Sequence, residues 1–233
     1  MRLDKFLVHT NTCNRSEARS LVRSGRVLVN GAPVASSDFK INENTDIVTL
    51  DGKPVIYEQF SYYMLNKPAG VVSACEDNRD NTVLDFFKNE PCRGLFPVGR
   101  LDKDTVGLLI ITNDGALAHR MLAPNKHVWK KYYVELEKPV TPEDITHLCS
   151  GVDIGDKTPT LPAKAEIPPE GSGDNATKLF LSIHEGRFHQ VKRMFEAIGN
   201  KVTYLKRVSF GNVELDPDLQ EGEYKKMELK NIE

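Results

Sequence analysis

The pattern of apolar and polar positions predicts a small first unit in which two helices precede short strands. Asn14 lies three residues before Glu17, which predicts a capping box at the start of a helix over residues 15–24, with Gly25 as the C′ residue behind it. The dipeptide Asn30-Gly31 predicts a tight turn between two strands. An earlier short helix is predicted by three apolar residues at helical spacing: Leu3, Phe6 and Leu7. Strands are predicted at 27–29, around Val34 and at 47–50.

A longer part of the chain follows an apolar linker that the sequence predicts at residues 53–61. Strands are predicted at six apolar stretches: 62–65, 106–112, 131–137, 179–183, 202–205 and 213–215. Helices are predicted at 83–87, 116–122, 142–150 and 188–198. A long loop or irregular hairpin is predicted over 155–175. This mixture predicts an α+β fold with a small domain at 1–57 and a larger one at 58–233.

Composition is that of a globular protein. The chain has 233 residues, of which 39% are hydrophobic and 27% charged, and this excludes a disordered chain and a membrane protein. The longest apolar run, Val106–Ile111, is far shorter than the roughly 20 residues that a membrane span needs. The N-terminus lacks the pattern of a secretory signal. The four cysteines form no C-x-x-C pair, which favours free thiols in a cytoplasmic protein without bound metal.

Charge is distributed unevenly along the chain. The net charge is −2, but the stretches 1–26, 119–131 and 185–207 each carry +4, which leaves −14 on the other residues. Basic patches on an acidic body suit a protein that contacts a polyanion on one side. Ordinary solvated faces are the alternative.

Arginines recur in the first unit at spacings of four, four and three residues, which predicts one shared helix face: Arg15, Arg19, Arg23 and Arg26. The helix runs into the string Ser24-Gly25-Arg26-Val27-Leu28-Val29-Asn30-Gly31. Together these features resemble the S4 RNA-binding domain, and the resemblance implies that the four arginines bind RNA. A helix with exposed arginines and no ligand is the alternative.

Three polar strings lie beside apolar strands, and the first of them spans residues 99–109. Arg100 and Asp102 are two residues apart and point the same way in an extended segment. A carboxylate held beside cations stays ionised and can act as a nucleophile or a base. The alternative is a structural turn in which Asp102 and Asp104 cap backbone N–H groups.

The second and third strings span residues 130–135 and 185–194. Lys130 and Tyr132 share one face of a strand, which suits a base stacked beside a phosphate, although a core tyrosine is the alternative. The third string starts a helix with basic residues that would hold phosphate: Arg187, His189, Lys192 and Arg193. Lys192 could equally pair with a buried carboxylate.

In this order behind an S4-like unit, the strings resemble the RsuA-type family of ribosomal RNA pseudouridine synthases. The motifs are Gly-Arg-Leu-Asp-x-Asp-Thr-x-Gly-Leu-Leu, Lys-x-Tyr and Glu-Gly-Arg-x-His-Gln-Val-Lys-Arg-Met. The string Tyr63-Met64-Leu65-Asn66-Lys67-Pro68-x-Gly70 resembles the family's opening strand. The resemblance implies isomerisation of a uridine to pseudouridine, with no cofactor and no metal. It also implies a mixed, mainly antiparallel sheet with flanking helices around a cleft.

The resemblance implies roles for individual residues. Asp102 is the expected catalytic carboxylate, Tyr132 the ring on which the flipped base stacks, and Lys192 the cation that pairs with Asp102. Attack at C1′, proton abstraction to a glycal and attack at C6 all stay open. Four further residues are expected in the substrate pocket: Arg100, Arg187, His189 and Leu205. Lys130 and Arg193 are expected to contact RNA beside the arginines of the first unit.

The expected partner is ribosomal RNA, bound by a monomer without contact to a membrane. An S4-like unit without a long basic C-terminal tail favours 16S rRNA, either free or in a small-subunit assembly intermediate. An enzyme for 23S rRNA is the alternative. Two other classes stay open. A non-catalytic S4-domain assembly factor would not need Asp102, Tyr132 and Lys192 together, and a base-excision enzyme would release free uracil.

Overall fold

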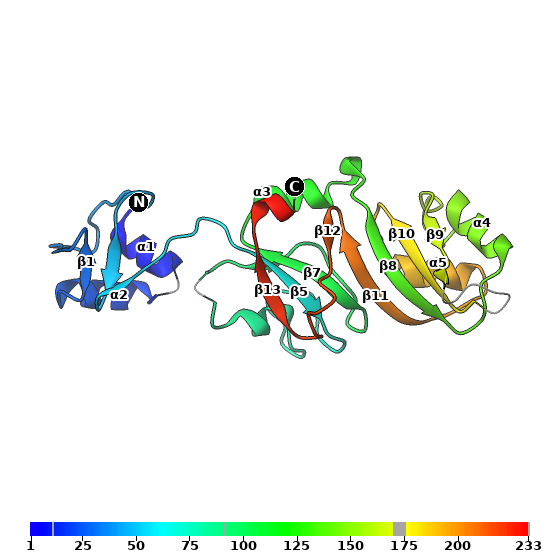
Figure 1. The fold of residues 1–233 in the computed structure, drawn as a ribbon, viewed down its shortest axis with the longest axis horizontal. Helices are drawn as coiled ribbons and strands as arrows, with labels where there is room; N and C mark the ends of the chain where they lie inside the picture. Colours follow the sequence, from blue (N-terminus) through cyan, green and yellow to red (C-terminus); the bar gives the residue numbers. More distant parts are fainter. Residues whose placement is uncertain (11, 91, 170–175, 233) are drawn as a thin grey trace. The chain divides into compact units, whose positions relative to one another are not determined.

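The computed structural model describes residues 1–10, 12–90, 92–169 and 176–232. The chain forms two compact units, both of which combine helices with β-sheet (Figure 1), so the predicted α+β class is confirmed. The first unit comprises Met1–Ser61 and Phe87–Leu95, and the second comprises Tyr62–Phe86 and Phe96–Glu233. Within the described ranges, no helix is long and apolar enough to cross a membrane.

In the first unit, two helices pack on a small antiparallel sheet. Helices α1 and α2 span Leu3–His9 and Arg15–Arg23. The strands, in the sheet order β2-β1-β3-β4, span Ala32–Pro33, Val27–Val29, Val48–Leu50 and Lys53–Pro54. The core includes side chains from both helices and from β1 and β3: Leu3, Phe6, Leu7, Ala18, Val22, Val27 and Val48. Strand β4 shortens the predicted linker, because the Asp51-Gly52 turn, with φ of +52° and +79°, returns the chain along β3.

The predicted caps of α2 are confirmed. The Glu17 N–H donates to Asn14 Oδ1 (2.9 Å), and the Asn14 N–H donates to the Glu17 carboxylate (2.8 Å). Gly25 follows the helix with a φ of +70°. Arg26 therefore lies beyond the helix and not on its arginine face. Its guanidinium donates to both carboxylate oxygens of Asp51 (2.8 and 2.5 Å).

The second unit is built on one large sheet, in the order β13-β5-β7-β11-β8-β10-β9, with β6 beside β7 and β12 beside β11. Its described strands pair antiparallel except for β7 and β11, so the predicted mixed, mainly antiparallel sheet is confirmed. The strands are β5 (Tyr62–Lys67), β6 (Phe96–Pro97), β7 (Val106–Thr112), β8 (Lys130–Leu136), β9 (Lys164–Glu166), β10 (Lys178–Ile183), β11 (Val202–Phe210), β12 (Val213–Glu214) and β13 (Tyr224–Met227). The helices are α3 (Gly115–Leu122), α4 (Pro142–Ser150) and α5 (Gln190–Ala197), with short 3₁₀ turns η1 (Val83–Phe87), η2 (Pro124–Lys126) and η4 (Leu229–Asn231).

The structure differs from the sequence prediction at several elements. Strand β11 continues to Phe210 because pairing with β7 and β8 holds its polar residues in the sheet. Helix α5 begins at Gln190, later than predicted, since His189 has a left-handed φ of +48°. The sequence does not predict β6, β9 or β13, which are too short to show a period. Strand β9 lies in the loop predicted over 155–175, whose final part, 170–175, is outside the described residues.

A glycine sets the close approach of the two parallel strands. Strand β7 is buried along its whole length, and its Gly107 pairs with Arg207 of β11. Gly107 has a φ of +98°, and a Cβ atom there would lie 2.3 Å from the Arg207 carbonyl oxygen. Glycine therefore lets β11 lie directly beside the start of β7, where a pocket opens.

Candidate functional site

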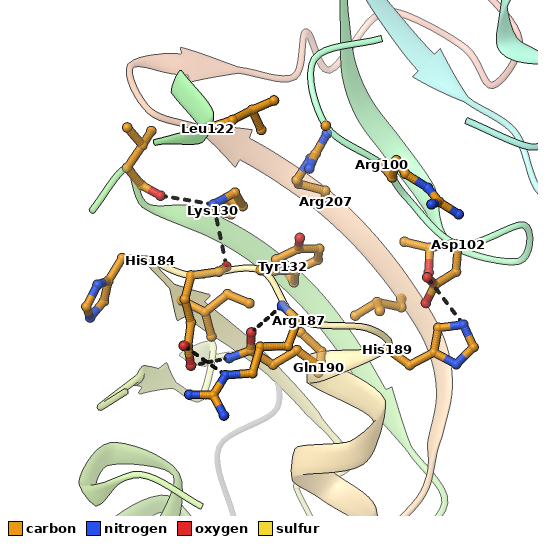
Figure 2. A pocket seen from close by; sticks show the side chains of 18 of the residues that line it. Arg100, Asp102, Leu122, Lys130, Tyr132, His184, Arg187, His189, Gln190 and Arg207 are labelled. Carbon is orange, nitrogen blue, oxygen red and sulfur yellow. Dashed lines mark hydrogen bonds and ion pairs between the residues drawn. The ribbon is translucent and has the colours of Figure 1, made fainter. Parts of the chain in front are cut away.

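The second unit contains a pocket of about 480 Å³ (Figure 2). Its walls come from the loop before β7, strand β8, the segment between β10 and α5, the start of α5 and strand β11. The lining includes eight residues that the sequence singles out: Arg100, Asp102, Lys130, Tyr132, Arg187, His189, Lys192 and Leu205. The fold thus brings all three polar strings to one cavity.

The other predicted residues are not in the lining of this pocket. Arg193 donates to the Ile154 carbonyl oxygen (2.5 Å) and to the Asp156 carboxylate (2.6 Å), which ties α5 to the loop between α4 and β9. The predicted RNA-binding arginines belong to the first unit, where all four are exposed: Arg15, Arg19, Arg23 and Arg26.

Asp102 lies at one side of the pocket beside two basic groups. Lys192 Nζ is 3.3 Å from Asp102 Oδ2, and His189 Nε2 is 3.6 Å from Asp102 Oδ1. Lys192 also contacts Asp104, at the shorter distance of 2.6 Å, and this hydrogen bond holds the pKa of Asp104 below its usual range. The two carboxylates differ in access, since the side chain of Asp104 is 73% exposed and that of Asp102 is 27% exposed. Asp102 is therefore the carboxylate that a ligand in the pocket would meet.

A buried lysine holds the loop that carries Asp102. Lys67, at the end of β5, donates through Nζ to four carbonyl oxygens at 2.8–3.3 Å: those of Pro68, Asp102, Lys103 and Thr105. Ser73 adds a second support, because its hydroxyl bonds both the N–H and the carbonyl oxygen of Leu101 (3.0 and 2.9 Å). Burial lowers the pKa of Lys67 to about 8, against the opposing charges of nearby carboxylates. These contacts fix the backbone of the loop that carries the Asp102 carboxylate.

Tyr132 and Arg207 lie opposite each other on β8 and β11. Both side chains are buried, with 7% of Tyr132 and 1% of Arg207 exposed. Arg207 donates through Nε to the Leu108 carbonyl oxygen (2.8 Å). Burial lowers the pKa of Arg207, and a hydrogen bond with Tyr132 opposes this shift. Tyr132 is thus held by a cation at the pocket wall.

Lys130 is a second cation on the same side of the pocket as Arg207. Its Nζ donates to the carbonyl oxygens of Val128 (3.3 Å) and Glu185 (3.5 Å). Burial, with a contribution from the charge of Arg207, lowers the pKa of Lys130 to about 8. In the view of Figure 2, Tyr132 lies between Lys130 and Asp102.

Arg187 lines the pocket, but its polar atoms are used within the protein. Its guanidinium donates to the carbonyl oxygens of Thr158 and Pro159 (2.6 and 2.8 Å) and to the Glu185 carboxylate (3.1 Å). Gln190 joins this network by donating to Glu185 (2.8 Å) and accepting from the Arg187 N–H (3.0 Å). Arg187 therefore shapes the turn into α5 and has few free donors for a phosphate.

The pocket offers acid–base and stacking chemistry. A carboxylate next to a lysine can serve as nucleophile or base, and an aromatic ring beside it can stack on a base. No group of three or more His, Cys, Asp or Glu side chains among the described residues is placed to hold a metal ion. Sequence reasoning assigned no role to Lys67 or Arg207, although Lys67 stands in the string 63–70 that resembles the family's opening strand.

Two family models match parts of this chain. The RNA pseudouridylate synthase family model matches residues 61–197, and the S4 domain model matches residues 1–47. An uncharacterized RNA pseudouridine synthase of Bacillus subtilis (strain 168), YtzG, is 48% identical over 97% of this chain and 95% of its own length. Ribosomal small subunit pseudouridine synthase A of Haemophilus influenzae is 40% identical over 100% of this chain and 98% of its own length.

A solved structure is similar over the whole chain. A crystal structure of a pseudouridylate synthase matches with a TM-score of 0.68 and 39% identity, covering 100% of this chain and 98% of that one. The family match spans the strings that line the pocket up to the end of α5, and the S4 match spans the arginine-bearing helix. The chain belongs to the RNA pseudouridylate synthase family and carries an S4 domain at its N-terminus.

Proposed function

We propose that this RNA pseudouridine synthase isomerises one uridine of 16S rRNA, with Asp102 as the catalytic carboxylate. The observation that carries the proposal is the pocket itself, where Asp102, Tyr132 and Lys192 meet from three distant segments. The substrate choice is supported by relatives named ribosomal small subunit pseudouridine synthase A, one of which, from Escherichia coli (strain K12), is 39% identical over the whole chain.

The reaction needs no external reactant. The bond from N1 of uracil to C1′ of the ribose breaks, the base turns, and C5 bonds to C1′ while the proton on C5 is lost and N1 gains one. Asp102 acts on the sugar in this proposal, either by bonding to C1′ or by removing a proton to give a glycal. Lys192, whose Nζ is 3.3 Å from Asp102 Oδ2, supplies the positive charge that faces the carboxylate in the pocket.

The other pocket residues bind the flipped nucleotide. Extruding a base from its stack costs a few kcal/mol, and stacking on the Tyr132 ring offsets part of that cost. Leu205 contributes an apolar wall, and Arg100, which is exposed at the rim, supports the extruded nucleotide. His189 adds a polar group beside Asp102.

The two domains divide the work in this proposal. The domain at 58–233 carries the chemistry, and the domain at 1–57 binds RNA. Arg15, Arg19 and Arg23 are exposed and spaced by four residues on α2, so they present three cations along one helix face. Arg26 adds a fourth cation, held in place by Asp51.

Tritium release tests the reaction and the substrate together. Transcripts of 16S and 23S rRNA carrying tritium at C5 of uridine are incubated with the full chain, because only bond formation at C5 releases that hydrogen to water. Release from 16S rRNA, or from reconstituted small subunits, with none from the Asp102→Asn variant supports the proposal. Release from 23S rRNA alone overturns the substrate, and free uracil in place of tritium overturns isomerisation. Binding without either product would favour an assembly factor.

A further inference from the structure

Two cations in the pocket lining, Lys130 and Arg207, form no ion pair with a carboxylate among the described residues. Arg207 is 1% exposed, and its Nη2 atom has no hydrogen-bond partner among the residues that the structure describes. Among the described residues, Lys130 donates only to backbone carbonyl oxygens. The carboxylate whose charge acts on Lys130 is that of Glu185, and its oxygens accept hydrogen bonds from other donors: Leu161 N–H, Gln190 Nε2 and Arg187 Nε.

Both cations contact the same aromatic ring, and the charge of Arg207 acts on Lys130. Lys130 Nζ is 5.2 Å and Arg207 Cζ is 4.9 Å from the centroid of Phe210. Thr105, at the start of β7, is a further buried group in the pocket lining whose hydroxyl lacks a partner in the described part of the chain. Buried polar groups are normally paired, because leaving one unpaired costs free energy. Buried polar groups without a protein partner in the lining of a pocket are therefore available to bind a polar ligand.

We propose that Lys130 and Arg207 form a subsite for the negative charge that uracil carries after its N1–C1′ bond has broken. The inference rests on the proposed function. When that bond breaks, its electron pair stays on N1, and the detached ring becomes an anion whose charge spreads to its two carbonyl oxygens. Asp102 meanwhile bonds to C1′ or takes a sugar proton, and either step supplies the electron pair that C1′ loses to N1.

The position of the pair favours the base over a backbone phosphate. Arg207 lies opposite Tyr132 across the strand pair, and Tyr132 is the ring on which the base stacks in the proposed function. Arg207 and Tyr132 are each more than nine-tenths buried, and Lys130 is half-buried. A flipped base enters such an enclosed site, whereas a phosphodiester stays with the RNA backbone outside. Preorganised cations in a site of low dielectric stabilise a developing anion strongly, since they need no reorientation during the reaction.

Neutral variants test the subsite against a control on the same strand. Arg207→Met and Lys130→Met each remove one pocket cation, whereas Lys206→Met removes a cation from the neighbouring position of β11, which is outside the pocket lining. Single-turnover rates and RNA dissociation constants are measured with the 16S transcript over a range of salt concentrations. We expect each pocket variant to lower the rate about 100-fold or more. RNA affinity and its salt slope stay unchanged, Lys206→Met keeps the wild-type rate, and Arg207→Lys recovers part of the loss.

Other outcomes overturn the subsite. A weaker affinity with a salt slope lowered by about one, at an unchanged saturating rate, would assign the pair to an RNA phosphate. Partial unfolding of Arg207→Met under the assay conditions, measured by urea titration, would assign its lost rate to the fold, because Arg207 also bonds the Leu108 carbonyl oxygen. Unchanged rates in both variants would also refute the subsite. A wild-type protein that releases no tritium would instead refute the proposed function.

Discussion

The two units of this protein use the same kind of side chain in opposite environments. In the first unit, Arg15, Arg19 and Arg23 stand exposed along α2. In the second unit, Lys130 and Arg207 are held among strands and lose part or all of their contact with water. Exposed cations attract a polyanion at a distance and are screened by salt, whereas buried cations act over a few ångströms and are screened little. In the proposed function, the exposed arginines provide affinity for RNA and the buried cations act on one base.

This division has a structural basis. Arg15, Arg19 and Arg23 form a row on α2, the arginine row. This row needs only a capped helix, because side chains four residues apart share a face without help from the rest of the fold. The pocket cations need β7, β8 and β11 to meet, with Gly107 permitting the close approach of β11. Damage to the row should therefore weaken binding gradually, and damage to the pocket should stop turnover.

The largest expected change in rate distinguishes Asp102 from Asp104, the two carboxylates of the loop before β7. Asp102→Asn should lower the single-turnover rate by at least about 1,000-fold while RNA affinity stays the same, since the carboxylate acts only on the reacting atoms. Asp104→Asn is the matched control and should lower the rate less than about tenfold, because Asp104 is 73% exposed and outside the pocket lining, and its ion pair with Lys192 is solvated. Equal losses for the two variants, measured by tritium release, would contradict this assignment.

Tyr132 should show the next largest effect. Tyr132→Leu removes the stacking surface, which is worth about 1–3 kcal/mol for each base, so the rate should fall by about 10- to 100-fold. Tyr132→Phe keeps the ring and loses only the hydroxyl that faces Arg207, and it should retain more activity than Tyr132→Leu. If the two variants behave alike in single-turnover kinetics, stacking is not the role of this ring.

The arginine row predicts a change in affinity alone. Arg19→Ala with Arg23→Ala should weaken RNA binding by about tenfold at low salt and reduce the slope of log affinity against log salt by about 1.5. Lys40→Ala with Lys53→Ala removes the same charge from exposed positions of the first unit outside α2 and serves as the control. An unchanged salt slope for the arginine pair would mean that α2 does not contact RNA.

The buried lysines predict a small pH dependence of stability. Lys67 and Lys130 have pKa values of about 8 in the folded protein, below the 10.5 expected when unfolded. Between these values the unfolded chain binds more protons, so the free energy of unfolding should rise with pH by at most about 1.4 kcal/mol per pH unit for each lysine. Urea unfolding followed by Trp129, the only tryptophan, measures the second unit from pH 8 to 9.5. The slope should be lower in Lys130→Met.

Raised pKa values of Tyr133 and Tyr204 act in the opposite direction nearer pH 10, because the unfolded tyrosines ionise first. The scan therefore ends below that range. A free energy of unfolding that falls steadily between pH 8 and 9.5 would contradict the lysine assignment.

Local signals predicted much of the fold. The capping pair Asn14 and Glu17, the turn at Asn30-Gly31 and the apolar run 106–112 each depend on neighbouring residues, and the structure confirms them. Strand β13, which pairs with β5 over four residues, has no such signal, because its place in the sheet is fixed by a distant partner. Helix α5 shows the intermediate case, since its periodicity is local and its start at Gln190 depends on the turn at His189.

The site divides in the same way. Asp102, Tyr132 and Lys192 stand in long strings whose resemblance to a family points to them, and all three line the pocket. The environment of Arg207 could not be predicted, because an arginine on a strand is usually exposed and only the packing of three strands shows that it is buried. The closer contact of Lys192 with Asp104 likewise depends on the exact path of a loop.

A pseudouridine map of 16S rRNA tests the central claim most directly. Unmodified transcript and reconstituted small subunits are incubated with the wild-type chain or with Asp102→Asn, then labelled with carbodiimide and read by primer extension. We expect one new stop with the wild-type protein and none with the variant. An equal stop with Asp102→Asn would contradict the role of the pocket carboxylate, and no stop on either RNA would contradict the proposed substrate.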